Sequence, residues 1–220
     1  MTKESGVRKP AVSPRATATK RVRLSPEERR EQLITLGTRM LRDRALEDVS
    51  IGEIAQQAGI SRGLLFHYFP TKQDFHLAIV QHANAALLER TTPDRTLAPY
   101  EMLRDSIERY IDYVTDNRTS YLALLRGPAS ASPELTSMVN AHRQAQVERL
   151  LTEAPIPLDD TDLPRLTLAL RGWIAFVEET TLTWLREEPI PREDLIDLLV
   201  GALAGLALNL SPALAAALHP

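Results

Sequence analysis

Residues 50–75 read SIGEIAQQAGISRGLLFHYFPTKQDF, a sequence typical of two short helices joined by a glycine turn and followed by the start of a third. Ser50 is a predicted N-cap, because its hydroxyl can accept a hydrogen bond from the amide of Glu53, whose side chain can complete a capping box. Gly59 should end the first helix, since glycine readily takes the left-handed backbone conformation. Ser61 can cap the second helix. This order predicts a helix-turn-helix motif.

The second helix of this motif presents a predicted recognition face. Leu65 and Phe69 lie four residues apart and should face a helical core. That spacing turns the other side chains toward a DNA groove, namely Arg62, Gly63, Leu64, His67 and Tyr68. We expect Arg62 to read bases, because a guanidinium can pair with guanine through two hydrogen bonds, and Gly63 to let the backbone enter the groove. His67 is a second candidate base contact, with an ordinary surface or core histidine as the alternative.

Contacts to the DNA backbone are predicted on both sides of this helix. Ser50 and the amides at its helix start can hold one phosphate, where the helix dipole is positive. Thr71 and Lys72 can hold another, with Thr71 capping the next helix after a chain reversal at Pro70. Tyr68 is expected to contact phosphate as well. The predicted DNA contacts in this stretch are Ser50, Ser61, Arg62, Gly63, His67, Tyr68, Thr71 and Lys72.

Positive charge gathers near the motif, although the whole chain carries a net charge of -3. Residues 1–72 contain 14 Lys and Arg against 8 Asp and Glu, a net of +6, which leaves -9 for residues 73–220. Most of the excess lies in residues 1–24, whose Ser, Thr, Pro and Ala content predicts a disordered basic tail. Arg21 and Arg23 immediately precede the first predicted helix, and we expect them to contact DNA. A solubilising tail is the alternative.

The run AQQAGISRGLLFHYFPTKQDF resembles the signature of the TetR family of bacterial transcriptional regulators. The matching positions are Ile54, Ala55, Ala58, Gly59, Ser61, Gly63, Leu65, Tyr68, Phe69, Pro70 and Lys72. Phe66 stands where the family usually has a tyrosine, so a hydroxyl contact to phosphate is absent there. The resemblance implies a homodimer that binds palindromic, double-stranded operator DNA with two reading helices in successive major grooves. It also implies a small-molecule effector bound among the middle helices.

The chain before and after the motif predicts helices that complete a small core. The first helix should begin at a capping box formed by Ser25 and Glu28. Its apolar residues Leu33, Leu36 and Met40 can pack against the motif in a three-helix core, which is small for independent stability. A helix over residues 72–89 carries a long apolar stripe and should brace this core as a lever.

The fold as a whole is predicted to be all-α, with an N-terminal three-helix module and a larger helical effector-binding and dimerisation domain. Apolar periodicity and proline breaks predict further helices at 99–116, 119–125, 133–153, 164–187 and 191–209, and no alternating strand pattern of useful length occurs. The predicted domains are a tail at 1–24, a helix-turn-helix domain at 25–72 and the helical domain at 73–220.

Residues 195–210 predict a dimerisation helix, because the run LIDLLVGALAGLALNL is apolar almost all round. Gly201 and Gly205 form a small-residue groove that allows a close helix crossing in a two-fold four-helix interface. The predicted interface residues are Trp184, Leu195, Leu199, Gly201, Leu203 and Gly205. A membrane span is the rival interpretation, opposed by Asp197 within the run, by Pro212 after it and by the lack of a cationic flank.

Large side chains in the middle helices are candidates for an effector pocket, although each is also typical of an ordinary core. They are Met102, Tyr110, Tyr113, Tyr121, Met138, His142, Trp173 and Phe176. A partly apolar ligand is expected. Arg126, His142 and Arg143 could anchor an anionic head, with solvent-exposed helical charges as the alternative. Ligand binding should shift the population between two spacings of the reading heads, most simply relieving repression, with activation or corepression as alternatives.

Enzyme chemistry is disfavoured by what the sequence contains. There are no cysteines, and the five histidines form no recognised metal-ligand set. No Walker or dinucleotide glycine loop is present, and the adjacent Glu178 and Glu179 resemble a solvated pair more than a catalytic dyad. We therefore expect no cofactor, no metal and no catalytic site. The N-terminal segment lacks the apolar core of a signal peptide, so a cytoplasmic protein is expected.

Overall fold

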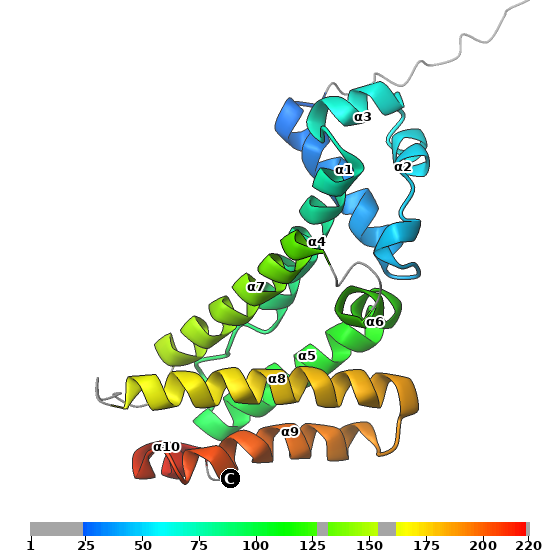
Figure 1. Cartoon of the computed structure of the whole chain (residues 1–220). Helices are drawn as coiled ribbons and strands as arrows, with labels where there is room; N and C mark the ends of the chain where they lie inside the picture. The colour runs from blue at the N-terminus through cyan, green and yellow to red at the C-terminus, as the bar shows by residue number, and fades with distance from the viewer. Residues whose placement is uncertain (1–23, 127–131, 154–161, 219–220) are drawn as a thin grey trace, which may run out of the picture.

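The computed structural model describes residues 24–126, 132–153 and 162–218, and every regular element within these ranges is helical (Figure 1). The prediction of an all-α fold is confirmed for this part of the chain. Arg21 and Arg23, with nearly all of the predicted tail, lie outside the described residues. So does most of the proline-rich connection that follows the helix predicted at 133–153.

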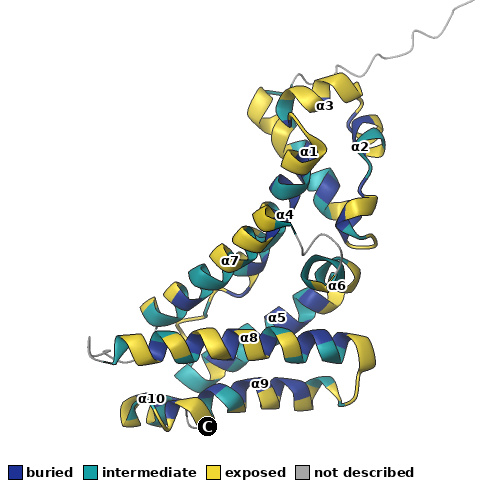
Figure 2. Cartoon of the chain, in the orientation of Figure 1, coloured by how far each residue is buried: buried dark blue, intermediate teal, exposed yellow. Residues whose placement is uncertain are grey.

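The head of the molecule consists of α1 (Pro26–Leu41), the 3-10 helix η1 (Leu46–Asp48), α2 (Ile51–Gln57) and α3 (Arg62–Tyr68). The predicted capping box at Ser25 is present, since its amide donates to Glu28 Oε2 at 2.7 Å and its Oγ accepts from the Glu28 amide at 3.1 Å. Leu33, Ile54, Leu65 and Phe69 are buried and contribute to one apolar core shared by the three helices (Figure 2). The predicted three-helix core is therefore confirmed.

Helix α4 (Lys72–Arg90) joins this head to the body. Thr71 caps it in a capping box with Asp74. Phe75 and Ile79 near its start are buried in the head core, whereas Leu87 near its end belongs to the body core. The head core therefore continues past the domain boundary predicted after residue 72. The 72–89 helix has the bracing position that its apolar stripe predicted.

The body contains α5 (Pro99–Asp116), α6 (Arg118–Arg126), α7 (Pro133–Thr152), α8 (Leu163–Glu187), α9 (Arg192–Ala207) and α10 (Pro212–Ala217). The predicted helix limits agree with these to within a few residues, but α10 is an additional helix that the sequence reasoning missed. Pro212 was taken as the end of an apolar run. It instead occupies the first turn of α10, whose N-cap Ser211 accepts from the Leu214 amide at 3.5 Å.

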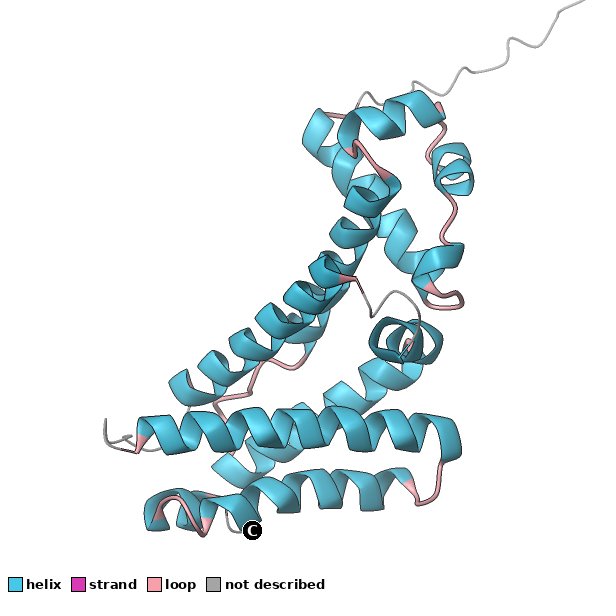
Figure 3. Ribbon diagram, in the orientation of Figure 1, coloured by secondary structure: helices cyan, strands magenta, loops and turns pink. Residues whose placement is uncertain are grey.

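Helices α8 and α9 form an antiparallel pair connected by a short loop (Figure 3). Trp173 Nε1 of α8 donates to the Leu199 carbonyl of α9 at 3.0 Å. Arg192 ties α9 to α5 through Asp112 at 2.6 Å, and Asp197 pairs with Arg104 of α5. None of the helices in the described ranges combines the length and apolar character needed to cross a membrane.

Candidate DNA-binding surface and effector cavity

The turn between α2 and α3 holds the two helices in a helix-turn-helix arrangement. Gly59 takes the left-handed conformation with φ 66°, as predicted, and the Ile60 amide donates to the Ala55 carbonyl at 2.9 Å. Ser61 then caps α3 by accepting from the Leu64 amide at 3.1 Å. Arg29 of α1 donates to the Ala58 carbonyl at 3.3 Å. The end of α2 is therefore fixed both by its own turn and by α1.

The exposed side of α3 carries the predicted base-reading residues. Arg62, Gly63 and His67 are exposed, whereas Tyr68 is half-buried against the head core. Two large apolar side chains share the exposed side, since Leu64 and Phe66 are each 41% exposed. The sequence predicted Leu64 to face the DNA groove but gave it no specific contact, and it gave Phe66 no contact with DNA. The sequence feature that could have identified them is their position: both are apolar residues on the side of α3 opposite to the buried Leu65.

The Arg62 side chain lies close to the start of α2. A Cβ atom added to Gly52 would lie 2.5 Å from Arg62 Nη2, so the guanidinium occupies space that only glycine leaves open. The position of this predicted base-reading side chain thus depends on a residue of the neighbouring helix. The sequence reasoning did not identify Gly52, because the contact joins two helices rather than two positions of one helix.

The predicted phosphate contacts already have protein partners. Ser50 Oγ accepts from the Glu53 amide at 3.4 Å, but the reciprocal capping-box bond predicted for Glu53 is wrong, because its carboxylate pairs with Arg44 at 2.5 Å. Lys72 Nζ donates to the Glu47 carbonyl at 2.9 Å, so its ammonium is tethered to η1 rather than mobile. Thr71 Oγ1 is bonded to Asp74. These side chains lie at the edges of the α2–α3 unit.

A cavity of about 210 Å³ lies within the body and extends to the underside of the head. Thr38 and Leu41 of α1 line one end, and Leu214 and Leu218 in the α10 region line another. Six of the eight predicted pocket residues line it: Met102, Tyr110, Tyr113, Tyr121, His142 and Trp173.

The other two predicted pocket residues, Met138 and Phe176, do not line this cavity. Met138 packs against the head core, because the start of α7 reaches past α4 to the head. Phe176 is 38% exposed on the outer side of α8, one residue away from the buried Val177 that does line the cavity. Helical periodicity shows which residues lie on the same side of a helix. It does not show whether that side faces the cavity, another core or the solvent.

The tyrosine hydroxyls on the cavity wall are already paired with protein groups. The Tyr110 and Tyr121 hydroxyl oxygens are 2.6 Å apart, and burial raises the pKa of both phenols. Tyr113 donates to the Ala83 carbonyl of α4 at 3.0 Å. These residues therefore connect α4, α5 and α6 around the cavity and remain uncharged at neutral pH.

Two of the three side chains predicted as anchors for an anionic ligand are engaged elsewhere. Arg143 donates to both carboxylate oxygens of Glu178, with Nε to Oε2 at 2.9 Å, and Arg126 pairs with Glu179. Neither arginine lines the main cavity. His142 does line it, and burial followed by the charges of Arg149 and Arg143 lowers its pKa from 6.5 to about 4. The imidazole is therefore neutral at neutral pH.

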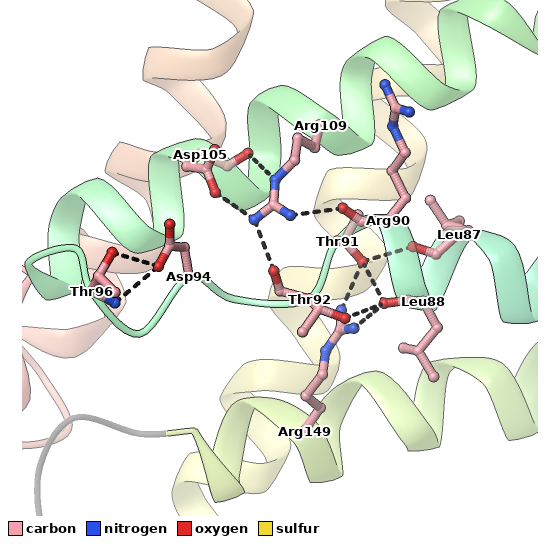
Figure 4. A network of polar contacts seen from close by, with 10 residues as sticks. All are labelled: Leu87, Leu88, Arg90, Thr91, Thr92, Asp94, Thr96, Asp105, Arg109 and Arg149. Atoms are coloured by element: carbon pink, nitrogen blue, oxygen red, sulfur yellow. Dashed lines mark hydrogen bonds and ion pairs between the residues drawn. The ribbon is translucent and has the colours of Figure 1, made fainter.

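The carboxyl end of α4 is held by two arginines from different helices (Figure 4). Arg149 of α7 donates to the Leu88 carbonyl and, at 2.8 Å, to Thr91 Oγ1. Arg109 of α5 donates to the carbonyls of Arg90 at 2.9 Å and Thr92 at 2.8 Å. Cations are favourable at this end of a helix, where unpaired carbonyls and the helix dipole are negative. Arg149 also lines the cavity, whereas Arg109 does not.

The predicted dimer residues divide between the inside and the outside of the protomer. Leu195, Leu199 and Leu203 are 0%, 0% and 5% exposed in the single chain, so their assignment to a dimer surface is wrong. Trp184 packs partly against the body core and donates to the Ile190 carbonyl at 2.8 Å. Gly201 and Gly205 do lie on the open side of α9, where an added Cβ would meet nothing within 4 Å.

Comparison with known proteins agrees with this geometry. Residues 33–79 match the family described as bacterial regulatory proteins, tetR family, and residues 99–206 match the tetracyclin repressor-like C-terminal domain. A tetR-family transcriptional regulator from Streptomyces coelicolor is 32% identical, with a TM-score of 0.72 over 89% of this chain and 88% of its own.

Curated relatives are also regulators or nucleoid factors. The HTH-type transcriptional activator FasR of Mycolicibacterium smegmatis is 24% identical over 80% of this chain and 81% of its own length. The nucleoid occlusion factor SlmA of Haemophilus influenzae is 28% identical over 48% of this chain, and the match spans 50% of SlmA. The head, the helical body and these likenesses together show that the chain belongs to the TetR family of transcriptional regulators, which are DNA-binding proteins and not enzymes.

Proposed function

We propose that this protein is a repressor that binds a palindromic operator as a homodimer and is released from it by a small, partly apolar effector. The observation that carries this proposal is the exposed side of α3, which presents Arg62 and His67 beside Leu64 and Phe66. Such a mixture suits a major groove, because guanidinium groups pair with guanine and apolar side chains contact the thymine methyl group. Because it would act on operator DNA, we propose that the protein works in the cytoplasm.

The proposed contacts divide into two classes. Arg62, Gly63 and His67 lie on the exposed face of α3 and are proposed to meet the base edges. Ser50, Ser61, Tyr68, Thr71 and Lys72 surround that face and are proposed to meet phosphates, which fix the register without reading sequence. Lys72 would exchange its bond to the Glu47 carbonyl for a phosphate, since a charged acceptor binds an ammonium more strongly than a peptide carbonyl does.

The proposed dimer surface is the outer side of the α8–α9 pair. Its exposed apolar residues are Leu168 and Phe176 of α8 and Leu198 and Leu206 of α9. Gly172, Gly201 and Gly205 leave open space between them, where an added Cβ meets nothing within 4 Å. Several large exposed apolar side chains on one side of a helix pair are typical of an interaction surface. A second copy of the same helix pair would cover it in the two-fold, four-helix arrangement that the sequence of α9 predicts, and the family resemblance implies a homodimer.

The DNA-binding part of the proposal is tested by selecting duplexes from random DNA with the full-length protein and measuring the affinity of the selected site. We expect a palindrome and a steep loss of affinity with added salt, because phosphate contacts release counterions. Arg62→Ala should weaken binding to the selected site by about 1–3 kcal/mol and relax its sequence preference. Gln81→Ala, an exposed position on α4 away from α3, is the matched control. Equal losses in the two variants would contradict the assignment of α3.

The sign of regulation is a separate measurement. In vitro transcription from a promoter containing the selected site should fall when the protein is added and recover with effector. Stimulation by the protein would favour an activator, a role that the FasR relative carries in its name. Both outcomes keep the DNA-binding assignment and differ only in where the bound dimer lies relative to the promoter.

A further inference from the structure

Three polar atoms on the cavity wall are buried without a hydrogen-bond partner in the described part of the chain. They are Ser106 Oγ on α5 and His142 Nε2 and Gln146 Oε1 on α7. All three residues line the same cavity. Buried polar groups in native proteins are almost always paired, because an unpaired one costs stability. Their convergence on one cavity therefore marks a place where a bound molecule would supply polar atoms.

A guanidinium lies on the same wall. Arg149 is seven residues after His142 and three after Gln146, so the three side chains share one face of α7. A guanidinium has five N–H donors, and the contacts of Arg149 with Leu88 and Thr91 use only part of them. No carboxylate of the described residues forms an ion pair with it.

The two carboxylates on the cavity wall are engaged by other arginines. Glu153 accepts two hydrogen bonds from Arg95, each of 2.6 Å, and Glu178 is held by Arg143. Arg149 is consequently a half-buried cation that is hydrogen-bonded to the end of α4 and that feels the charge of Glu153 without forming a direct ion pair with it. The lowered pKa of His142, caused by burial and then by Arg149 and Arg143, agrees with a positive potential at this end of the cavity.

Apolar side chains also line this cavity. They include Leu103, Ile107, Leu170, Trp173 and Val177, and the lining continues to Leu214, while Thr38, Asn84, Asn117 and Ser120 add polar groups. A ligand that fills this space would bury hydrocarbon against the apolar side chains.

We propose that the effector is an apolar carboxylic acid, whose carboxylate is bound by Arg149 with Ser106 and His142 donating beside it and whose hydrocarbon lies along the apolar wall. This inference rests on the proposed function, since it names the class of molecule that the effector cavity takes. Ser106 donates through its hydroxyl and the neutral His142 through Nε2–H. The Gln146 amide donates at the same place once its oxygen and nitrogen are exchanged.

The site also explains how binding would reach the head. The guanidinium that meets the carboxylate is the one that holds the end of α4 through Leu88 and Thr91. A carboxylate is a stronger acceptor than a peptide carbonyl or a hydroxyl, so it would draw Arg149 away from α4. The ligand would thereby loosen the helix that carries the head.

The test uses the full-length protein and three probes with the same hydrocarbon chain: decanoate, decan-1-ol and decyltrimethylammonium. Binding is measured by the quenching of Trp173 fluorescence, in a Trp184→Phe background, and by the shift in melting temperature. We expect decanoate to bind about tenfold or more tightly than decan-1-ol, and the cation to bind most weakly. Decanoate binding no tighter than decan-1-ol, or not binding at all, would overturn the proposal.

Variants separate the role of Arg149 from general damage to α4. Arg149→Met should abolish the preference for decanoate while decan-1-ol still binds, because methionine keeps the apolar stem. Arg109→Met removes the other arginine at the same helix end but lies off the cavity, so it should keep the preference. Loss of the preference in both variants, or in neither, would contradict the assignment. Decanoate that binds as expected without changing operator affinity would leave the ligand site standing and refute the effector function.

Discussion

The burial of His142 makes the stability of the ligand-free protein depend on pH. The imidazole lies on the cavity wall, and burial followed by the nearby charges of Arg149 and Arg143 lowers its pKa from 6.5 to about 4. In the unfolded chain the same side chain is solvated and has a pKa of about 6.5. Between pH 4 and pH 6.5 the imidazole of His142 is therefore mostly protonated in the unfolded chain and mostly neutral in the folded protein.

The sign of the effect follows from which state takes the proton first. Well above pH 6.5 the imidazole is neutral in both states and contributes nothing to the pH dependence. As the pH falls toward 4, the unfolded chain binds a proton that the folded protein does not, so the free energy of unfolding decreases. At about 1.36 kcal/mol per pKa unit, the loss between pH 7.5 and pH 5 amounts to about 2 kcal/mol, and the full loss below pH 4 to about 3 kcal/mol.

Urea unfolding at pH 7.5 and pH 5, followed by tryptophan fluorescence, measures this loss. We compare the natural protein with His142→Gln, which keeps a polar side chain but cannot titrate. The natural protein should lose about 2 kcal/mol more than the variant over this range. His76, whose pKa burial also lowers, is present in both proteins and cancels in the difference. Equal losses in the two proteins would refute the reasoning.

Three further predictions concern the close helix crossing, the dimer surface and the recognition helix. Gly37→Ala should destabilise the protein by about 1–2 kcal/mol in urea unfolding, because the new Cβ would lie 2.7 Å from the fully buried Ile79 Cγ1; an unchanged midpoint would contradict this. Gly205→Arg should convert the dimer to monomers in analytical ultracentrifugation, since it places a charge on the proposed interface, and a persisting dimer would exclude that surface. The natural protein should bind an operator with thymine at the position contacted by Leu64 roughly fivefold more tightly than the same operator with uracil there, because uracil lacks the methyl group. Leu64→Ala should abolish this preference, measured by fluorescence anisotropy with both duplexes, and an unchanged preference would contradict the contact.

The head was predictable because its signals are local. The capping serines Ser25 and Ser61 lie next to the amides that they satisfy, and Gly59 takes the left-handed conformation after α2 that glycine adopts without steric cost. Leu65 and Phe69 are buried as their spacing indicated. The predicted capping box at Glu53 failed for the opposite reason, since a partner from outside the helix, Arg44, takes its carboxylate.

The body was less predictable, because its helices are apolar on more than one side. In α9 the sequence offered leucines and glycines as equal candidates for the dimer surface. The structure packs Leu195 and Leu199 inward and leaves Gly201 and Gly205 outward. The internal face of such a helix is determined by contacts with helices that are distant in the sequence. The periodicity of the helix itself carries no information about those contacts. Phe176 was misplaced for the same reason.

The same limit explains why Arg149 carried no signal in the sequence. An arginine near the end of a helix is usually a solvated charge, and nothing in its neighbours predicts a cavity. Its importance comes from contacts about sixty residues away along the chain, where it holds the end of α4 through Leu88 and Thr91. In the half of α4 nearer the head, Ile79 packs closely against Gly37 of α1. Helix α4 has 19 residues and is about 28 Å long. A small displacement of its carboxyl end, where Arg149 binds, would therefore rotate the whole helix and move the head. Because α1 and α4 pack so closely at Gly37 and Ile79, α1 is expected to move with α4. Under the proposed function, Gly37 would therefore lie on the path between effector and operator, although it contacts neither.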